Sequence, residues 1–141
     1  MKVLFVCTGN INRSAAAEFM LRAVHPDWQI LGAATNLKSN KPMAKKMRER
    51  LASLGYVGME QHRSQALTKD LINWADVVIG FQDSHLIAVA TLGGVAKSLV
   101  DYLPEESKRF TKVPDPAFDS SGLTHILVTE LIQLAIPNIK E

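Results

Sequence analysis

The sequence predicts one α/β domain over residues 1–141, built on a four-stranded parallel sheet with helices on both faces. Short apolar runs typical of buried strands alternate along the chain with longer amphipathic runs typical of helices. A length of 141 residues and a hydrophobic content of 47% suit a single globular domain with a substantial core. No internal repeat, linker or low-complexity segment divides the sequence.

The first half of the chain is expected to form two strands and two helices. An apolar run predicts a strand over residues 2–6, and a helix over 14–24 is stopped by His25-Pro26-Asp27. A second strand is expected over 28–34. Pro42 suits the first turn of a helix over 42–54, which Gly55 would end. The apolar residues on one face of that helix are Met43, Met47, Leu51 and Leu54.

The second half continues the alternation. A short helix capped by Thr68 is expected to reach Trp74, and a buried strand follows over 75–80. A helix over 83–92 is broken by Gly93-Gly94, and a fourth strand is expected over 97–100. Loops are expected over 35–41, 58–66 and 104–117. The last helix, over 120–135, has an apolar stripe made of Leu123, Ile126, Leu127, Leu131 and Leu134.

We expect this sheet to be flavodoxin-like, with strand order 2-1-3-4. In open parallel sheets the ligand lies beyond the carboxyl ends of the strands. Cys7 stands at the carboxyl end of the first strand. The topology therefore places a functional site at Cys7.

Composition excludes several classes of function. The net charge of +2 is too small to indicate nucleic acid as a partner. No apolar run reaches membrane-spanning length, and residues 1–6 lack a signal-peptide layout. One cysteine allows no intramolecular disulfide, and no His, Asp or Glu cluster has metal-ligand spacing. We expect a cytoplasmic protein, a monomer or weak dimer, with no cofactor, metal, nucleic-acid or membrane partner.

The segment from Cys7 to Ser14 carries the strongest chemical signal. It joins the first strand to a helix N-terminus, where backbone N–H groups and the helix dipole favour an anion. A thiol opens this loop, and the guanidinium of Arg13, which can grip two phosphate oxygens, closes it. The pattern predicts chemistry on a phosphate monoester through a cysteine thiolate. The expected phosphate-binding residues are Thr8, Gly9, Asn10, Ile11, Asn12, Arg13 and Ser14.

Each residue of this loop also has a structural interpretation. Cys7 could be a small buried hydrophobe, but the Thr-Gly-Asn that follows does not continue a core strand. The helix N-terminus and Arg13 would favour its thiolate. Ser14 could be the helix N-cap as well as a donor to the sulfur. Asn10 could tolerate a left-handed turn or brace the loop with its amide.

Two residues outside the loop are candidates for the site. Asp115 lies between Pro114 and Pro116. This segment is either a plain turn or a rigid loop that holds the Asp115 carboxyl in place to deliver a proton. His62 stands in a loop, where a histidine is usually solvated or a structural hydrogen-bonder. The other histidines, His25, His85 and His125, are interpreted as structural.

The residues from Val6 to Ser14, with Glu18 in the helix, resemble the phosphate loop of the low-molecular-weight protein tyrosine phosphatases. Three further segments resemble family landmarks across essentially the whole chain: His62-Arg63-Ser64, Asp76-Val77-Val78-Ile79 and Asp115-Pro116. The resemblance implies hydrolysis of aryl phosphate monoesters. It implies a phosphotyrosine-containing protein or a small aryl phosphate as partner, and inorganic phosphate, sulfate or vanadate as ligands of the loop.

The resemblance also implies a role for each matching residue. Cys7 would be the nucleophile that forms a cysteinyl phosphate, and Arg13 would hold the phosphoryl oxygens. Asp115 would protonate the leaving phenolate and then activate water. A supporting network would consist of Ser14, which stabilises the thiolate, and Asn10, which holds the loop with His62 bonded to it.

The chain departs from the family pattern around the site. Asn12 stands where many members carry a second cysteine, so no disulfide can trap an oxidised Cys7. Paired tyrosines, a Met-Asp pair and an aromatic wall are common in the family. In their places this chain has Ala117-Phe118, Phe81-Gln82 and the non-aromatic segment 36–41. These differences indicate an atypical substrate pocket around an intact chemical core.

Four other functions fit parts of the pattern. A thioredoxin-coupled arsenate reductase needs further cysteines, which this chain lacks. A protein-arginine phosphatase tends to have a small threonine in place of Ile11, and the bulkier side chain favours phosphotyrosine. A phosphate-binding module would leave Cys7 and Asp115 without a role. A phosphotransfer subunit of a sugar transport system is unlike this chain because Arg13 follows the cysteine by six residues.

Overall fold

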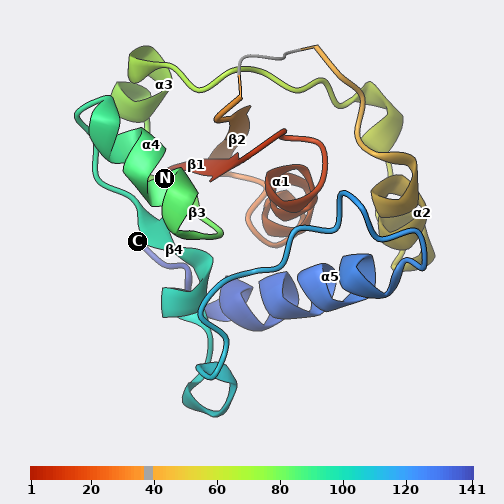
Figure 1. The fold of residues 1–141 in the computed structure, drawn as a ribbon. Helices are drawn as coiled ribbons and strands as arrows, with labels where there is room; N and C mark the ends of the chain where they lie inside the picture. Colours follow the sequence, from red (N-terminus) through yellow and green to blue (C-terminus); the bar gives the residue numbers. More distant parts are fainter. Residues whose placement is uncertain (37–39) are drawn as a thin grey trace.

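A computed structural model describes residues 1–36 and 40–141 of the chain. Its described part contains one parallel sheet of four strands in the order β2-β1-β3-β4 (Figure 1). The strands are β1 (Lys2–Cys7), β2 (Gln29–Ala34), β3 (Val77–Gly80) and β4 (Lys97–Ser98). The predicted fold class and strand order are confirmed.

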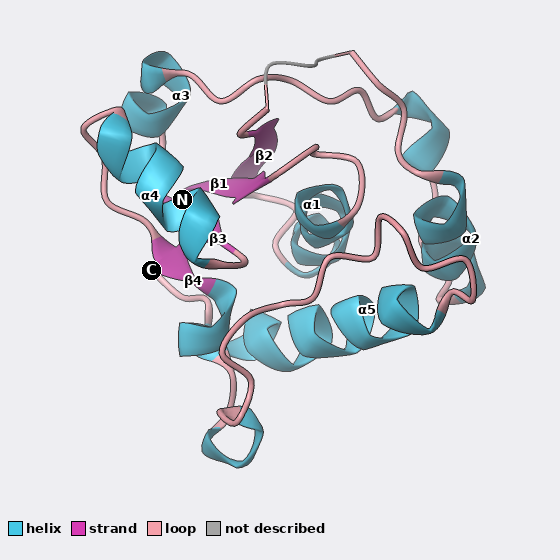
Figure 2. Cartoon of the chain, in the orientation of Figure 1, coloured by secondary structure: helices cyan, strands magenta, loops and turns pink. Residues whose placement is uncertain are grey.

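Helices cover both faces of this sheet, as predicted. The helices α1 (Arg13–Val24) and α5 (Leu123–Ala135) pack together on one face, and α2 (Lys45–Ser53) packs against α5. The shorter helices α3 (Lys69–Trp74) and α4 (Asp83–Thr91) lie on the other face. Figure 2 shows the sheet in magenta between these two groups of helices. Short 3₁₀ turns occur at Met59–Gln61, Leu99–Tyr102, Glu105–Ser107 and Ile136–Asn138.

The side chains of β1 alternate between the two faces of the sheet, so this strand contributes residues to the hydrophobic core on each face. Val3, Phe5 and Cys7 belong to the core under α1 and α5, whereas Leu4 and Val6 belong to the core with residues of α3 and α4. All five residues are at most 2% exposed. Both faces of β1 are therefore dry, and the Cys7 side chain emerges on the α1 side at the strand's carboxyl end.

The fourth strand is shorter than predicted. It ends at Ser98, and the apolar residues Leu99 and Val100 lie in a 3₁₀ turn. The Ser98 hydroxyl accepts a hydrogen bond from the Val100 N–H, and the Asp101 carboxylate accepts one from the Ser98 N–H. This capping box bends the chain where apolar composition alone favoured a strand.

The last helix was predicted with the wrong buried face. It begins at Leu123, after the left-handed Gly122, rather than at residue 120. Of the predicted stripe only Leu131 is fully buried, while Leu123, Ile126 and Leu134 are at least 37% exposed. Packing against α1 and α2 instead buries His125, Val128, Thr129, Leu131, Ile132 and Ala135. Arg50 of α2 donates to the Thr129 hydroxyl at 2.9 Å, which helps to set this face.

Helix α2 begins three residues later than predicted. Its N-cap is Ala44, whose N–H donates to the Ile11 carbonyl at 3.0 Å, so the chain from Pro42 runs extended beside the Cys7 loop. Gly55, at φ +94°, ends the helix as expected. Met43, Met47 and Leu51 are buried, but Leu54 is 40% exposed. Part of the loop predicted over 35–41 lies outside the described residues.

The described residues contain no helix that is long and apolar enough to cross a membrane. Within the same residues, no group of three or more His, Cys, Asp or Glu side chains is placed to hold a metal ion.

Candidate active site

The loop after β1 wraps around the sulfur of Cys7. The Asn10 N–H donates to Cys7 Sγ at 3.2 Å, and the Ser14 hydroxyl lies 2.9 Å from the same atom. Asn10 adopts a left-handed conformation with φ +54°, which asparagine tolerates better than most residues. That conformation turns the backbone N–H inward. The sulfur therefore lies between two donors, the Asn10 N–H and the Ser14 hydroxyl, near the N-terminus of α1.

The Asn10 side chain braces the loop. Its amide nitrogen donates to the Ser14 hydroxyl at 2.7 Å and to the Glu18 carboxylate at 3.3 Å, and its oxygen accepts from the Gln65 N–H at 3.2 Å. Because the Ser14 oxygen already accepts from Asn10, its own hydrogen is free to point at Cys7. The hydroxyl is thus held as a donor toward the sulfur.

His62 and Glu18 form the next layer of support. His62 Nε2 lies 2.7 Å from the Asn10 carbonyl, and a carbonyl only accepts, so Nε2 carries the proton. Its Nδ1 is 3.8 Å from a Glu18 oxygen. Burial lowers the pKa of His62 and raises the pKa of Glu18 to about 7. Both groups are therefore pushed toward their neutral forms.

Arg13 is the largest fully buried side chain of the described residues. Its Nη1 donates to the Gln82 amide oxygen at 2.5 Å and to the Val113 carbonyl at 2.9 Å. Its Nη2 lies 3.4 Å from the Thr8 hydroxyl and 3.7 Å from a carboxylate oxygen of Asp115. Burial lowers the Arg13 pKa, and Cys7 and Asp115 oppose that shift. A guanidinium stays charged in such a setting, so Arg13 brings a fixed cation to the loop.

Thr8 is oriented by a histidine of α4. The Phe81 N–H donates to His85 Nδ1 at 3.1 Å, so the neutral ring carries its proton on Nε2, which lies 3.1 Å from the Thr8 hydroxyl. Burial, with the nearby charge of Arg13, lowers the pKa of His85 to about 3. The Thr8 oxygen accepts from both His85 and Arg13. Its own hydrogen is left to donate elsewhere.

Asp115 faces the loop from the far end of the chain. Its carboxylate lies beside Arg13 and accepts from the Ala117 N–H at 3.0 Å, which fixes the turn after Pro116. The side chain is 46% exposed. It lines a cavity of about 230 Å³ together with Cys7, Thr8, Gly9, Ile11, Asn12, Arg13, Asn36, Ala117 and Phe118. The thiol, the guanidinium and the carboxylate thus open into one space.

One loop residue differs from its predicted local role. Helix α1 begins at Arg13 with Asn12 as its N-cap, so Ser14 is not the cap. Its hydroxyl points back to Cys7, where Asn10 holds it, and this contact replaces the cap bond. The Asn12 side chain makes no cap bond either, and its buried Oδ1 has no hydrogen-bond partner among the described residues.

Three contributors to the site were missed in the sequence. Gln82 anchors Arg13, His85 orients Thr8, and Gly32 of β2 lies so close that a Cβ there would be 2.5 Å from Asn10 Nδ2 and from Glu18 Oε2. Gln82 could have been found, because it follows β3 at the sheet edge next to Cys7. His85 and Gly32 carry no such sequence signal.

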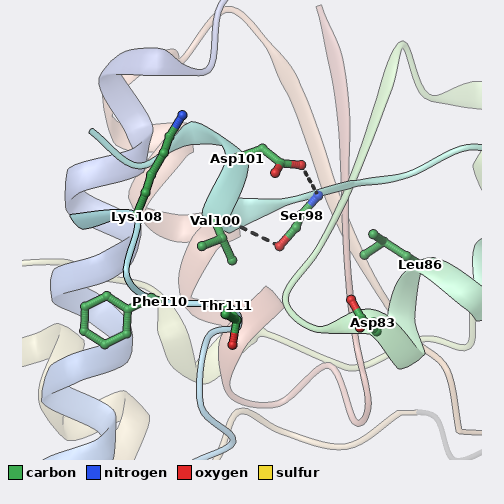
Figure 3. A pocket seen from close by; sticks show the side chains of 8 residues that line it. All are labelled: Asp83, Leu86, Ser98, Val100, Asp101, Lys108, Phe110 and Thr111. Atoms are coloured by element: carbon green, nitrogen blue, oxygen red, sulfur yellow. Dashed lines mark hydrogen bonds between the residues drawn. The ribbon is translucent and has the colours of Figure 1, made fainter. Parts of the chain in front are cut away.

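A larger hollow of about 510 Å³ lies away from this chemistry, between the start of α4 and the segment around Thr111 (Figure 3). Among its polar side chains, Ser98 and Asp101 form the capping box, and Lys108 lies 3.2 Å from Glu105. None of the predicted site residues lines it. The smaller cavity at Cys7 is therefore the candidate active site.

Residues 2–140 match the sequence profile of the family described as "Low molecular weight phosphotyrosine protein phosphatase". The chain therefore belongs to this family. It is 35% identical over 77 residues to "Probable low molecular weight protein-tyrosine-phosphatase EpsP" of Ralstonia solanacearum, covering 55% of this chain and about half, 52%, of that relative. It is 27% identical over 116 residues to the low molecular weight protein-tyrosine-phosphatase Wzb of Salmonella typhi, covering 82% and 76%.

Solved structures show the same fold. A protein tyrosine phosphatase from Entamoeba histolytica has a TM-score of 0.87 at 22% identity, covering 99% of this chain and 94% of that one. The YwlE arginine phosphatase from Geobacillus stearothermophilus has a TM-score of 0.81 at 23% identity, covering 98% and 89%. At these identities the likeness extends to the fold, which carries both kinds of phosphatase.

Proposed function

We propose that the protein is a protein-tyrosine phosphatase that hydrolyses aryl phosphate monoesters through a cysteinyl-phosphate intermediate. Membership of the family supports this proposal. The observation that carries it is the convergence of Cys7, Arg13 and Asp115 on one cavity, with the Asn10 N–H and the Ser14 hydroxyl beside the sulfur. A nucleophile, a phosphate-gripping cation and a proton donor are the groups that this reaction needs.

The first step transfers the phosphoryl group to sulfur. The Cys7 thiolate attacks phosphorus, an S–P bond forms, and the bond from phosphorus to the ester oxygen breaks. Arg13, the loop N–H groups and the Thr8 hydroxyl stabilise the negative charge on the phosphoryl oxygens. Asp115, protonated at this stage, gives its proton to the departing phenolate oxygen, so that a neutral phenol leaves.

The second step releases phosphate. The Asp115 carboxylate takes a proton from a water molecule, whose oxygen attacks the phosphorus of the intermediate. The P–S bond breaks, and the electron pair returns to Cys7 as the thiolate. The Ser14 hydroxyl, aimed at the sulfur, stabilises that leaving thiolate.

The lining of the cavity favours an aryl ester. Ile11, Ala117 and Phe118 are apolar, and the Phe118 ring is fully exposed at the rim. An exposed ring beside the cavity can pack against the ring of a phosphotyrosine. A phosphoarginine guanidinium would need polar partners in place of Ile11, so the phosphotyrosyl side chain fits better.

Turnover of p-nitrophenyl phosphate by wild type and Cys7→Ser tests the proposal. We expect Cys7→Ser to lose turnover but still to bind inorganic phosphate, sulfate or vanadate, since Arg13 and the loop N–H groups remain. Residual turnover above about a tenth of wild type would contradict the assignment of Cys7 as nucleophile. A peptide panel with phosphotyrosine, phosphoserine and phosphoarginine then separates the substrate classes, and preference for phosphoarginine would replace the aryl substrate.

The remaining expectations also stand as proposals. We infer that residues 1–141 act as one phosphatase domain, because the family profile spans 2–140. We place the protein in the cytoplasm, because an unpaired thiolate nucleophile persists in a reducing compartment.

A further inference from the structure

Another hollow, of about 520 Å³ and distinct from the one in Figure 3, adjoins the cavity at Cys7. The two share Gly9, Ile11 and Asn36, so these residues separate the hollow from the reaction cavity. The rest of its lining comes from the start of α2 and the extended segment before it: Lys41, Pro42, Met43, Ala44, Lys45 and Arg48. We call this hollow the α2 subsite.

The α2 subsite is rich in positive charge. Lys41 and Lys45 are exposed, and half-buried Arg48 is held by a hydrogen bond from its Nε to the Met43 carbonyl at 3.1 Å. Within residues 1–36 and 40–141, one carboxylate lies within 4.0 Å of these cations: Glu49, at 4.0 Å from Lys45. The first turn of α2 contains no acidic residue. Lys41 and Arg48 thus remain available to an anion.

The shape of the subsite restricts the kind of anion. Apolar groups of Ile11, Pro42 and Met43 line it between the cations. A bare inorganic ion would leave these surfaces unused, whereas an aliphatic stem that ends in a carboxylate would contact both. A glutamate side chain has this character. Asp115, which would repel such a group, lines the reaction cavity and not the α2 subsite.

We propose that the α2 subsite binds an acidic side chain next to the phosphotyrosine of a polypeptide substrate. The inference rests on the proposed phosphatase function and adds a substrate preference to it. Phosphate held at Cys7 directs the tyrosine out of the reaction cavity, and the flanking residue crosses the shared wall at Ile11 to reach Lys41, Lys45 and Arg48. A small aryl phosphate has no group that extends so far.

Two phosphotyrosyl peptides test the proposal: one with glutamate on both sides of the phosphotyrosine, the other with glutamine there. We expect wild type to show a kcat/KM about tenfold higher for the glutamate peptide, mainly through KM, since the contact is made equally in ground and transition states. Lys41→Gln/Lys45→Gln should reduce this ratio by about three- to tenfold, the size expected of partly exposed charge pairs. Added salt should lower the wild-type ratio in the same direction.

Lys46→Gln is the matched control. Lys46 is an exposed lysine of the same helical turn, does not line the subsite, and lies where its charge lowers the pKa of His125 of α5. It should keep the wild-type ratio. Both lysines of the double variant are exposed, so an unchanged melting temperature is expected and verifies its folding.

The outcomes separate this inference from the proposed function. Equal kcat/KM for the two peptides, with activity on both, would overturn the α2 subsite alone. A preference that survives in Lys41→Gln/Lys45→Gln would assign it to other residues and overturn it as well. A wild-type protein inactive on both peptides and on p-nitrophenyl phosphate would overturn the phosphatase function, and the subsite with it.

Discussion

Replacing Glu18 with glutamine should make the protein more stable at alkaline pH and leave its stability unchanged at acidic pH. Glu18 is 6% exposed and accepts a hydrogen bond from the Asn10 amide at 3.3 Å. Desolvation outweighs that bond and raises its pKa from 4.5 to about 7. Glutamine has nearly the shape of the protonated acid and keeps an oxygen for Asn10, but it never carries a charge.

The sign and size of the effect follow from proton linkage. A raised carboxyl pKa stabilises the folded state fully below pH 4.5, and this contribution is lost as the pH rises through about 7. A tenfold difference in proton affinity is worth about 1.4 kcal/mol, so the full loss is ~3 kcal/mol. Glu18→Gln avoids it. The lowered pKa values of His62 and His85 act in the opposite sense, with stability lost as the pH falls below 6.5, in both proteins.

Urea denaturation of wild type and Glu18→Gln at about pH 4.5, 6, 7.5 and 9 measures the difference directly. The variant should match wild type at the lowest pH and exceed it by about 3 kcal/mol at the highest. Glu130→Gln, at an exposed position of α5, is the control and should show no such trend. A difference that does not change with pH would refute the argument that burial raises the pKa of Glu18 in the folded protein.

Three further substitutions address the chemistry and its support. Arg13→Lys should lower kcat/KM for p-nitrophenyl phosphate about a hundredfold, because the planar guanidinium with its two parallel donors is lost while the charge stays. A near-wild-type rate would show that Arg13 does not contact the phosphate in the transition state. Asp115→Asn should slow aryl phosphates with poor leaving groups far more than those with good ones, and an equal loss across the series would reduce Asp115 to shaping its loop. Gly32→Ala would place a Cβ 2.5 Å from Asn10 Nδ2 and Glu18 Oε2. It should lower both kcat and the free energy of unfolding, the latter by about 1–3 kcal/mol. An unchanged urea midpoint and kcat would show that the hydrogen-bond network of Asn10 and Glu18 can accommodate the added methyl group.

The parts of the fold that depend on local sequence signals could be predicted from the sequence. Alternating strand and helix patterns predicted the sheet, and Gly55 and Thr68 marked a helix end and a helix cap where the structure has them. The buried face of α5 was wrong because apolar residues surround that helix. Which of them are buried depends on where α1 and α2 lie, and the polar Thr129, which accepts a hydrogen bond from Arg50, is buried along with His125. Such packing is not encoded in any single segment.

Some residues of the candidate site could likewise be identified from the sequence, whereas others could not. Cys7 and Arg13 could be singled out because their residue types and spacing predict phosphate chemistry, whereas Asp115 was open between a turn and a proton donor until the family resemblance was considered. Gln82 could be placed near the site from its position after β3, but its contact to Arg13, like that of His85 to Thr8, exists only after β3 pairs beside β1. The position of Gly32 likewise follows from the pairing of β1 with β2, which brings that glycine against Asn10 and Glu18.

The residues around the thiol and the residues at the rim of the cavity differ in burial and in hydrogen bonding. Asn10, Arg13 and Ser14 of the loop are buried, and their side chains are hydrogen-bonded, so changing one of them leaves a partner unsatisfied at a cost of about 1–3 kcal/mol. The rim that a substrate would meet beyond the phosphate is exposed and makes few such bonds, as at Phe118, Lys41 and Lys45. We therefore expect substitutions at this rim to change the substrate preference of the proposed phosphatase without disturbing the thiol. The departures from the family pattern at Ala117-Phe118 lie at this rim, whereas Cys7, Arg13 and Ser14 match the family in the buried layer.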